Sequence, residues 1–464
     1  MKKVYKSVEN LDKKCYERYD LSADLLQEHA ALGMYNHIKT LPNIKTILIV
    51  CGSGNNGADG MALARLAQEE YIVTLVVLSP PTSPMAKLQL QRAIKLGIEI
   101  TDTIEAKNFD VIVDAIFGSG LNKSLSSFYI DTINTLNNLD GVKIACDIPS
   151  GLDIDGNATQ GCFKADITCT MGSGKLSLYS DIAKNYVGEI KVVNLGLSSH
   201  KYEDDSRYFV LDKSDLVLPF RDNKSSHKGN FGHLLVVAGD KIGASMLSSE
   251  AGFALGAGLV SIMTHNDKMP LPYHIMHTHQ IPHNTTSIAI GMGLGNFDES
   301  EIKEILALDV AKVCDADLFY TPLILDILHN DNVVLTPHPK EFVSLLRICE
   351  IDDISVDILQ KNRFDYVEKF CSKYPKVTLL LKGSNIIISQ NQNVYINPLG
   401  TNILSQGGSG DVLSGFIASY LAQNFTAIQS AINGSLALAV SGRNYKLNNY
   451  SLKPQDLIEE VKKI

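Results

Sequence analysis

Short apolar runs that end abruptly at glycines or polar residues recur along this chain of 464 residues. The clearest is Thr46–Cys51, which has no polar residue after the threonine and is followed at once by the glycine-rich residues 52–60. A run without alternation is typical of a strand that is buried on both faces of a parallel sheet. A helical pattern follows over residues 61–71. This order of strand, glycine-rich loop and helix predicts an α/β fold.

Three further strands are predicted in the first half, at residues 73–78, 111–116 and 142–146. Loops that follow parallel strands gather at one edge of the sheet. We therefore expect four polar residues to converge there: Asn56, Asp114, Asp147 and Ser150. Their hard oxygen ligands suit a monovalent or alkaline-earth cation better than zinc. A single Asp after a strand is usually only a turn former, but three such loops favour a site.

Residues 54–60, 114–121 and 147–151 together resemble the epimerase domain of NAD(P)H-hydrate repair enzymes. That family has a Rossmann-like three-layer α/β/α fold, interconverts the R and S forms of hydrated NADH or NADPH at C6, and binds a potassium ion. The resemblance implies potassium at Asn56, Asp114 and Ser150, with Asp147 as our choice for proton handling. It implies hydrate contacts at Asn55, Asn56, Gly57, Ala58, Asp59, Gly118, Ser119, Gly120, Leu121, Asn122, Lys123 and Asp147.

Ala58 stands where the family usually has glycine, and we expect it to narrow this loop.

The polar residues 198–205 predict a linker, which divides the chain into domains at 1–203 and 207–464. Before the first strand, apolar positions at helical spacing over residues 7–40 predict two helices that are separated near Asp20, with Ser22 as the N-cap of the second.

The glycine-rich residues 406–415 run into a helical pattern near the end of the chain. A helix start of this kind attracts phosphate. Asp411 would lie at its mouth, where a carboxylate can take a proton from a hydroxyl that attacks phosphorus. Taken alone, this pattern is more often a turn followed by an Asp N-cap.

Other segments of the second half favour the interpretation of residues 406–415 as a phosphate-binding helix start. Strands are predicted at residues 233–239, 288–291, 313–315, 333–336 and 378–381, and each ends at glycine or polar residues such as His338 and Lys382. This again is the pattern of a parallel sheet with its ligand edge on one side.

These segments, in this order, resemble the ribokinase-like α/β dehydratase domain of the same repair family, so the resemblance covers nearly the whole chain. It implies hydrate contacts at Ala244, Gly293, His338 and Asp411. It implies nucleotide contacts at Lys382, Gly383, Ser384, Asn385, Ile386 and Gly410. Lys340 and Ile386 depart from the family's usual glycine and threonine, and residues 401–405 are an unusual version of the loop before the glycines.

The family's reactions would make this a bifunctional enzyme that epimerises the hydrates and dehydrates the S form with ADP or ATP and Mg²⁺. We expect Asp411 to deprotonate the C6 hydroxyl as that oxygen attacks the terminal phosphoryl group, while residues 408–410 stabilise the transferring charge. Elimination of phosphate then restores NADH or NADPH, and AMP or ADP is released.

Three alternatives remain open. The second half fits a kinase of a small vitamin or sugar, since ribokinase-like domains occur in such kinases as well as in dehydratases. The first half fits a non-catalytic nucleotide sensor or partner-binding module. A dehydrogenase is disfavoured because neither half has GxGxxG with a ribose-binding acid downstream.

The formal net charge of −9 argues against a nucleic-acid binder. The sequence shows no signal-peptide core and no apolar stretch that is long enough to span a membrane, and its scattered cysteines favour free thiols. We therefore expect a cytoplasmic homo-oligomer whose partners are small molecules.

Overall fold

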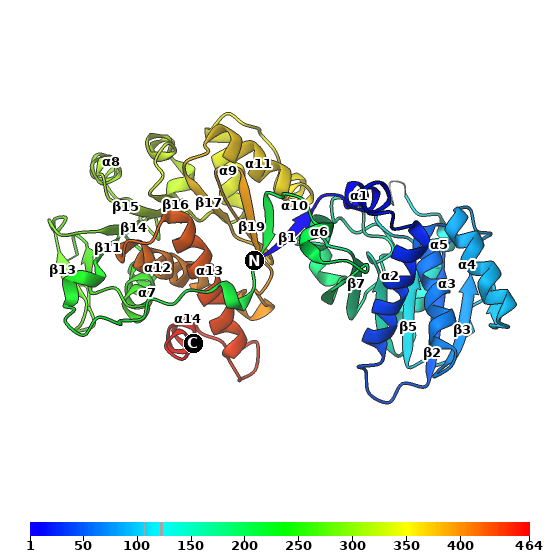
Figure 1. Ribbon diagram of the computed structural model, residues 1–464. Coiled ribbons are helices and arrows are strands. Elements are labelled where there is room, and N and C mark those ends of the chain that lie inside the picture. Colours follow the sequence, from blue (N-terminus) through cyan, green and yellow to red (C-terminus); the bar gives the residue numbers. More distant parts are fainter. Residues whose placement is uncertain (106, 121–123, 267) are drawn as a thin grey trace. The chain divides into compact units, whose positions relative to one another are not determined.

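Residues 1–105, 107–120, 124–266 and 268–464 are described by the computed structural model of the chain (Figure 1). The chain divides into two units: Lys3–Ser206, and Arg207–Ile464 together with Met1–Lys2. Of the predicted hydrate contacts, Leu121, Asn122 and Lys123 lie outside the described residues.

A parallel sheet forms the centre of the unit Lys3–Ser206, with strands in the order β4-β3-β2-β5-β6-β7-β9. The strands are β2 (Thr46–Cys51), β3 (Ile72–Val77), β4 (Ile100–Thr101), β5 (Val111–Ala115), β6 (Val142–Cys146), β7 (Ile167–Met171) and β9 (Glu189–Val193). The predicted strands of the first half and their parallel pairing are therefore confirmed.

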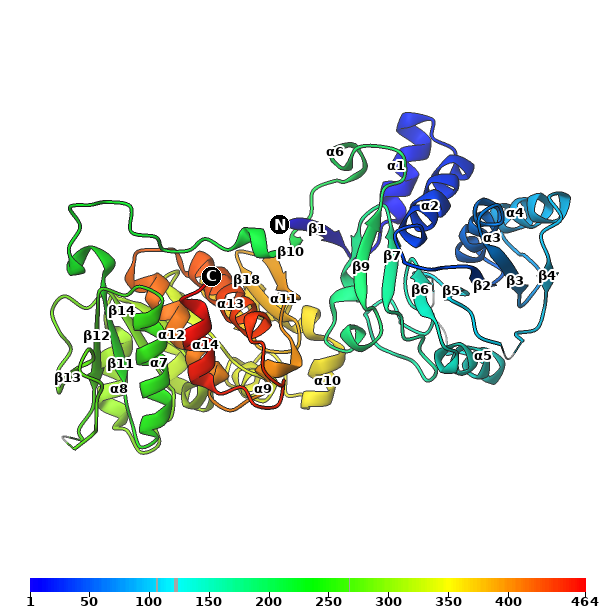
Figure 2. The same ribbon diagram turned by 90° about the horizontal axis from the view of Figure 1, so that it is seen from below.

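Helices cover both faces of this sheet. Ile47 and Ile49 of β2 pack into one core with α2 (Ala23–Ile38) and α3 (Asn55–Ala67), while Leu48 and Val50 pack into another with α5 (Ser127–Asn138). Figure 2 shows α2, α3 and α4 (Pro84–Lys95) on one side of the strands and α5 on the other. This is the three-layer α/β/α arrangement that the apolar runs predict.

The predicted glycine loop needs a correction, because most of it is helix. α3 begins at Asn55 rather than near residue 61, with Gly54 as its N-cap. The helix lies so close to the sheet that a β-carbon on Gly60 would be 2.6 Å from that of Ala115. The glycines therefore permit close helix–sheet packing, and Asn55, Asn56 and Asp59 lie on the first turns of a helix.

The predicted helix pair and linker have different outcomes. α1 (Glu9–Tyr19) and α2 are separate, and Ser22 Oγ accepts the Leu25 N–H, so the pair and its N-cap are confirmed. The predicted linker contains α6 (Ser199–Tyr202), whose Tyr202 is buried and donates a hydrogen bond of 2.7 Å to Asp12. Within the same unit, β1 (Lys2–Tyr5) pairs with β8 (Gly174–Lys175).

The sheet of the unit Arg207–Ile464 follows the order β13-β12-β11-β14-β15-β16-β17-β18-β19-β10. Its strands are β10 (Tyr208–Val210), β11 (His233–Val237), β12 (Leu259–Met263), β13 (Met276–Thr278), β14 (Ser287–Ile290), β15 (Ala311–Cys314), β16 (Val333–Leu335), β17 (Thr378–Leu381), β18 (Ile386–Gln390) and β19 (Asn393–Asn397).

Pairing is parallel from β13 to β17, as the sequence predicts, but β17–β18 and β18–β19 are antiparallel. The unpredicted hairpin turns at Asn391 and Gln392, both of which have positive φ.

The helices of this unit lie on the two sides of its strands in Figure 1, with α7, α12, α13 and α14 on one side and α8, α9 and α11 on the other. They are α7 (Ile242–Ala254), α8 (Glu299–Ala307), α9 (Pro339–Ile348), α10 (Val356–Lys361), α11 (Arg363–Lys373), α12 (Ser409–Ala422), α13 (Ala427–Asn444) and α14 (Pro454–Val461). α12 is buried from Val412 onward, so the glycine-rich segment starts a core helix.

Helices α7 and α12 pack backbone against backbone. A β-carbon on Gly415 would collide with the carbonyl oxygen of Ser248, and Ser248 Oγ donates to the Asp411 carbonyl at 2.8 Å. This α7–α12 contact therefore fixes where α12 begins.

We expect Gly415→Ala to lower the free energy of unfolding by about 1–3 kcal/mol, because the two helices must separate to admit the methyl group. Chemical denaturation measures this loss. Gly243→Ala is the matched control: Gly243 lies in the partner helix α7, a β-carbon there meets nothing within 4 Å, and its effect should be neutral or stabilising by less than about 1 kcal/mol. Equal effects of the two substitutions would contradict this account of the contact.

Candidate active sites

A pocket of about 470 Å³ opens at the carboxyl ends of the strands in the unit Lys3–Ser206. It is lined by Val8, Asp12, Ser53, Gly54, Asn55, Asn56, Asp59, Ile116, Phe117, Gly118, Ser119, Gly120, Asp147, Met171 and Lys175. Residues that follow β2, β5, β6 and β7 thus meet around one cavity, as the parallel topology requires.

Most of the predicted hydrate contacts in the described residues line this pocket: Asn55, Asn56, Asp59, Gly118, Ser119, Gly120 and Asp147. Gly57 and Ala58 do not line it, because both are buried where α3 packs on the sheet. Ala58 is compatible with the helix at this position, so the expected narrowing of a loop does not arise.

Oxygen atoms cluster beneath the pocket around Asp114, which is fully buried. Its carboxylate accepts the Ser150 N–H at 2.7 Å and the Ser150 hydroxyl at 2.6 Å. Ser150 Oγ in turn accepts the Phe117 N–H at 2.8 Å, and Asn56 donates to the Phe117 carbonyl at 2.9 Å. Burial raises the pKa of Asp114 to about 6, against the opposing effect of the Ser150 hydrogen bonds.

The Asn56 side-chain oxygen is buried in this cluster and has no hydrogen-bond partner among the described residues. Such an atom costs free energy unless something binds it. A carbonyl-type oxygen beside a carboxylate, a hydroxyl and a main-chain carbonyl forms a donor set that suits a hard cation. The predicted cation ligands Asn56, Asp114 and Ser150 are thus brought together.

Two charged residues of the pocket were missed by the sequence predictions. Lys175 is 2% exposed, and its Nζ lies 2.6 Å from Asp147 Oδ1. Asp12 comes from α1 and accepts the Tyr202 hydroxyl. The apolar run Ile167–Met171 followed by Gly172, Gly174 and Lys175 is the same strand-end pattern used elsewhere, and it could have identified the lysine.

In the unit Arg207–Ile464, charged side chains meet at the carboxyl ends of β15, β16 and β17. Lys382 Nζ lies 2.8 Å from Asp315 Oδ1 and 3.9 Å from Glu341 Oε2. Asp315 is 2% exposed and also accepts the Ser414 hydroxyl of α12 at 2.7 Å. Asp315 and Glu341, which no motif singled out as site residues, therefore hold the predicted nucleotide residue Lys382.

His338 caps α9 and is fixed by Glu341. The Glu341 carboxylate accepts the His338 N–H at 2.7 Å and lies 3.1 Å from His338 Nε2, while Nδ1 accepts the N–H groups of Lys340 and Glu341. Burial raises the pKa of Glu341 to about 7, although the charge of Lys382 opposes this shift. Lys340 contributes its N–H to the cap, and its side chain is exposed.

Asp411 lies at the third residue of α12, after the N-cap Gly408. The first N–H groups of a helix have no partner within the helix, so they can bind an anion at its end. Burial, followed by the charge of Asp315, raises the pKa of Asp411 to about 6, while Lys382 lowers it. A β-carbon on Gly410 would lie 3.5 Å from Lys382 Nζ, so the glycine segment and this lysine are neighbours.

The other predicted contacts lie on adjoining loops. Lys241 links two of them, because its N–H donates to the Gly293 carbonyl at 3.1 Å and its carbonyl accepts the Ala244 N–H at 3.2 Å. After β17, Gly383 and Ser384 are exposed, whereas Asn385 and Ile386 are buried. Ile386 is the first residue of β18 and pairs with Asn397 of β19, so it belongs to the hairpin of these two strands.

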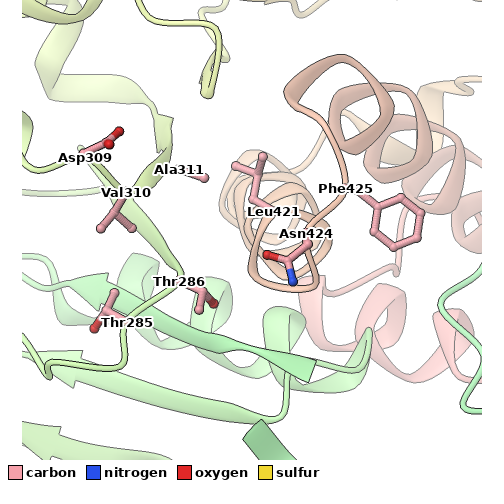
Figure 3. Close-up of a pocket in the computed structure, with 8 residues that line it drawn as sticks. All are labelled: Thr285, Thr286, Asp309, Val310, Ala311, Leu421, Asn424 and Phe425. Atoms are coloured by element: carbon pink, nitrogen blue, oxygen red, sulfur yellow. The ribbon is translucent and has the colours of Figure 1, made fainter. Parts of the chain in front are cut away.

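A separate hollow of about 400 Å³ lies at the opposite, amino-terminal ends of β14 and β15 (Figure 3). It is lined by Thr285, Thr286, Asp309, Val310, Ala311, Leu421, Asn424 and Phe425. Asp309 is the charged group among them, and its sign is wrong for phosphate. The carboxyl edge is the better candidate for a nucleotide.

Comparison with known proteins extends these observations. A protein-family model described as NAD(P)H-hydrate dehydratase matches residues 234–463. A second family model, described as YjeF-related protein N-terminus, matches residues 23–177. The bifunctional NAD(P)H-hydrate repair enzyme Nnr of Helicobacter pylori is 41% identical over 477 residues, covering 100% of both chains. The protein of the same name from Coxiella burnetii is 34% identical and covers 85% of this chain and 84% of its own.

Among solved structures, an ADP/ATP-dependent NAD(P)H-hydrate dehydratase from Bacillus subtilis, co-crystallised with ATP/Mg²⁺, is 23% identical with a TM-score of 0.45, covering 53% of this chain and 92% of its own. A ribokinase-like superfamily protein from Enterococcus faecalis is 22% identical with a TM-score of 0.46, covering 56% and 96%.

The two α/β units, each with polar residues gathered at the carboxyl edge of its sheet, define a two-domain α/β enzyme of nucleotide metabolism. The chain belongs to the family of bifunctional NAD(P)H-hydrate repair enzymes, with an epimerase-type N-terminal unit and a dehydratase C-terminal unit. The predicted family and α/β fold class are confirmed.

We expect Lys382→Met to destabilise the protein by about 3 kcal/mol at pH 8, because it leaves two buried carboxylates without their cation. The loss should be smaller at pH 5: Glu341, with a pKa of about 7, is already largely protonated there. Urea unfolding at the two pH values measures the difference. Lys376→Met, which removes an exposed lysine at the other end of β17, should have little effect, and a pH-independent loss for Lys382→Met would contradict the ion-pair account.

Proposed function

We propose that the unit Lys3–Ser206 interconverts the R and S hydrates of NADH and NADPH, and that the unit Arg207–Ile464 dehydrates the S form with ADP or ATP. The observation that supports the proposed dehydration is the arrangement at Asp411. A half-buried carboxyl with a raised pKa stands at the start of a core helix beside a paired lysine. This places a base next to an anion-binding helix end, as phosphoryl transfer requires.

Asp411 acts as the general base. It takes the proton of the C6 hydroxyl while that oxygen attacks the terminal phosphoryl group of the nucleotide, and AMP or ADP leaves. The C6–O bond then breaks with loss of phosphate as the electron pair of the ring nitrogen forms a double bond to C6. A proton leaves C5, its bonding pair forms the C5–C6 double bond as the first pair returns to nitrogen, and the reduced nicotinamide is restored. A pKa near 6 suits this role, since the carboxylate is ionised at neutral pH yet basic enough to accept a proton.

Lys382 and the first N–H groups of α12 offset the negative charge of the phosphates. Mg²⁺, when bound with the nucleotide, would neutralise charge on the transferred group. Asp317 and Asp240 lie on the loops after β15 and β11. Their carboxylates accept the N–H groups of Gly295 and Asn296, at the end of the glycine loop at residues 293–295. They are the candidates to hold the ion.

Potassium is the cation that we propose for the oxygen cluster under the epimerase pocket. Asn56, Asp114 and Ser150 would hold it, together with the Phe117 carbonyl. The unpartnered oxygen of Asn56 supports this choice. Among the described residues, no group of three or more His, Cys, Asp and Glu side chains could hold a metal ion.

A kinase that releases a stable phosphate ester is the second candidate for the C-terminal unit, since the same geometry would serve it. Product analysis separates the two: free phosphate with the absorbance of reduced nicotinamide supports the dehydratase, and a retained ester supports the kinase.

A cytoplasmic location and a homo-oligomeric state remain predictions. All eight cysteines are free and buried, which fits a reducing compartment. No helix in the described part of the chain has the length and apolar character needed to cross a bilayer.

We expect Asp411→Asn to lower dehydration of the S hydrate by at least about 100-fold, because the general base is lost, while hydrate binding stays close to that of the original enzyme. In the unaltered enzyme, kcat/KM should fall as the pH drops through about 6, where the base becomes protonated. Absorbance of the reduced nicotinamide measures both. Asp357→Asn, in the first turn of α10 and exposed, is the control, and undiminished turnover in Asp411→Asn would refute the role.

Potassium should raise the melting temperature of the protein relative to lithium or choline at equal ionic strength. At ten times its dissociation constant, one bound ion adds about 1.4 kcal/mol of stability. Asn56→Ala should abolish the difference between the salts. Asn36→Ala, an exposed residue of α2, should retain it. A difference that persists in Asn56→Ala would place the ion elsewhere.

A further inference from the structure

Three carboxyl groups and one ammonium group line the epimerase pocket: Asp12, Asp59, Asp147 and Lys175. They come from α1, α3, the loop after β6 and β8. Carboxyl groups that share a site cannot all ionise at neutral pH without cost, so the position of the one cation decides which of them is charged.

Lys175 is directed to Asp147 by three contacts. Its Nζ lies 2.6 Å from Asp147 Oδ1, and it also donates to Thr170 Oγ1 at 3.0 Å and to the Met171 carbonyl at 3.2 Å. These partners satisfy the donor capacity of an ammonium group and hold it in place. With 2% exposure it cannot swing into solvent.

Asp147 is also fixed by the backbone. Its Oδ1 accepts the Met171 N–H at 3.1 Å, and the residue itself has a left-handed conformation with φ of 67°. A non-glycine residue in this conformation is uncommon, and it aims the side chain at the lysine from the end of β6. The Met171 N–H and the Lys175 ammonium group therefore both donate to one oxygen of Asp147.

Asp59 faces the same cavity without a cation of its own among the contacts described. Burial, and then the charge of Asp147, raise its pKa well above the usual range, while a hydrogen bond from Gln27 and the charge of Lys175 act in the opposite direction. The Asp59 side chain therefore keeps its proton to a higher pH than an ordinary aspartate does.

Other titratable groups face this pair from the elements packed against it. They are Asp12 and Tyr16 of α1, Tyr202 of α6, and Cys51 and Cys146 at the ends of β2 and β6. Burial raises the pKa of each tyrosine and cysteine, so these stay neutral at physiological pH. Burial also raises the pKa of Asp12, against the hydrogen bond from Tyr202.

We propose that Lys175 is the positioning residue that makes Asp147 the base of the epimerase pocket and leaves Asp59 as its proton donor. This inference rests on the proposed epimerase activity and names residues and roles that it did not specify.

The step balances as follows for either epimer. The Asp59 carboxyl gives its proton to the C6 hydroxyl, the C6–O bond breaks, and water leaves as the electron pair of the ring nitrogen forms a double bond to C6. Water adds to the other face of C6, that double-bond pair returns to nitrogen, and Asp147 takes the proton that the incoming water loses. One water leaves, one enters, and one proton passes from Asp59 to Asp147, which the reverse reaction or solvent returns.

The test uses the full chain and the R hydrate without nucleotide, so that only conversion to the S hydrate is followed. We expect a bell-shaped pH profile of kcat/KM. Lys175→Met should lower the rate at pH 7 by about 100-fold. It should also move the acidic limb upward by about one pH unit or more, because a neighbouring cation favours the charged form of a carboxyl group and the variant lacks that cation. Lys175→Arg keeps the charge and should restore the position of that limb.

Asp59→Asn tests the donor separately and preserves side-chain volume. It should lower the rate by about 100-fold and remove the alkaline limb while leaving the acidic limb in place. Lys191→Met, on the neighbouring strand β9 with its side chain 40% exposed, is the control and should match the unaltered protein. Dehydration of the S hydrate with ADP reports that each variant is folded.

Different results overturn different claims. A Lys175→Met variant that is slow but keeps the original pH profile refutes the positioning role, and an alkaline limb that persists in Asp59→Asn refutes the donor. If the unaltered protein does not interconvert the hydrates at all, the proposed epimerase activity fails, and this inference fails with it.

Discussion

Parallel pairing of strands that are buried on both faces is the constraint on which both sites depend. It sends every strand in one direction, so the loops after β2, β5, β6 and β7 reach one pocket, and those after β15, β16 and β17 reach Lys382. Helices on both faces remove water from the sheet, and burial then raises the pKa values of Asp114, Glu341 and Asp411. The layered fold therefore supplies both the position and the protonation behaviour of the polar side chains.

The two units use one electrostatic arrangement. Each has a lysine at a strand end that is paired at 2.6–2.8 Å with one aspartate, Lys175 with Asp147 and Lys382 with Asp315. Each also has a second aspartate, Asp59 or Asp411. Burial raises the pKa of this second aspartate, and the charge of the lysine-paired aspartate raises it further. Each unit thus pairs its lysine with one of two neighbouring carboxyl groups.

Much of this could be predicted from the sequence because it follows from local patterns. Apolar runs located β2 and β11, and Ser22 located the start of α2. The glycines at residues 54–60 led to the wrong prediction of a loop. Glycine often marks a loop, whereas here it allows α3 to pack closely against the sheet. Lys175 follows a strand-end pattern, but its pairing with Asp147 cannot be read from that pattern. Asp315, at the end of a predicted strand, and Glu341 were not assigned to the site because they pair with Lys382 from distant segments, which no local pattern encodes. The hairpin of β18 and β19 was missed for the same reason.

The α7–α12 contact has a further consequence for how this enzyme can change. Ala244 and Asp411 lie near the starts of these two helices, and the close approach of Gly415 to the Ser248 backbone sets the spacing between the helices. The loops around this contact can change while the spacing stays the same. A methyl group added at Gly415 would shift Asp411, which we propose as the general base, so a change in the core would be detected first as a change in catalysis.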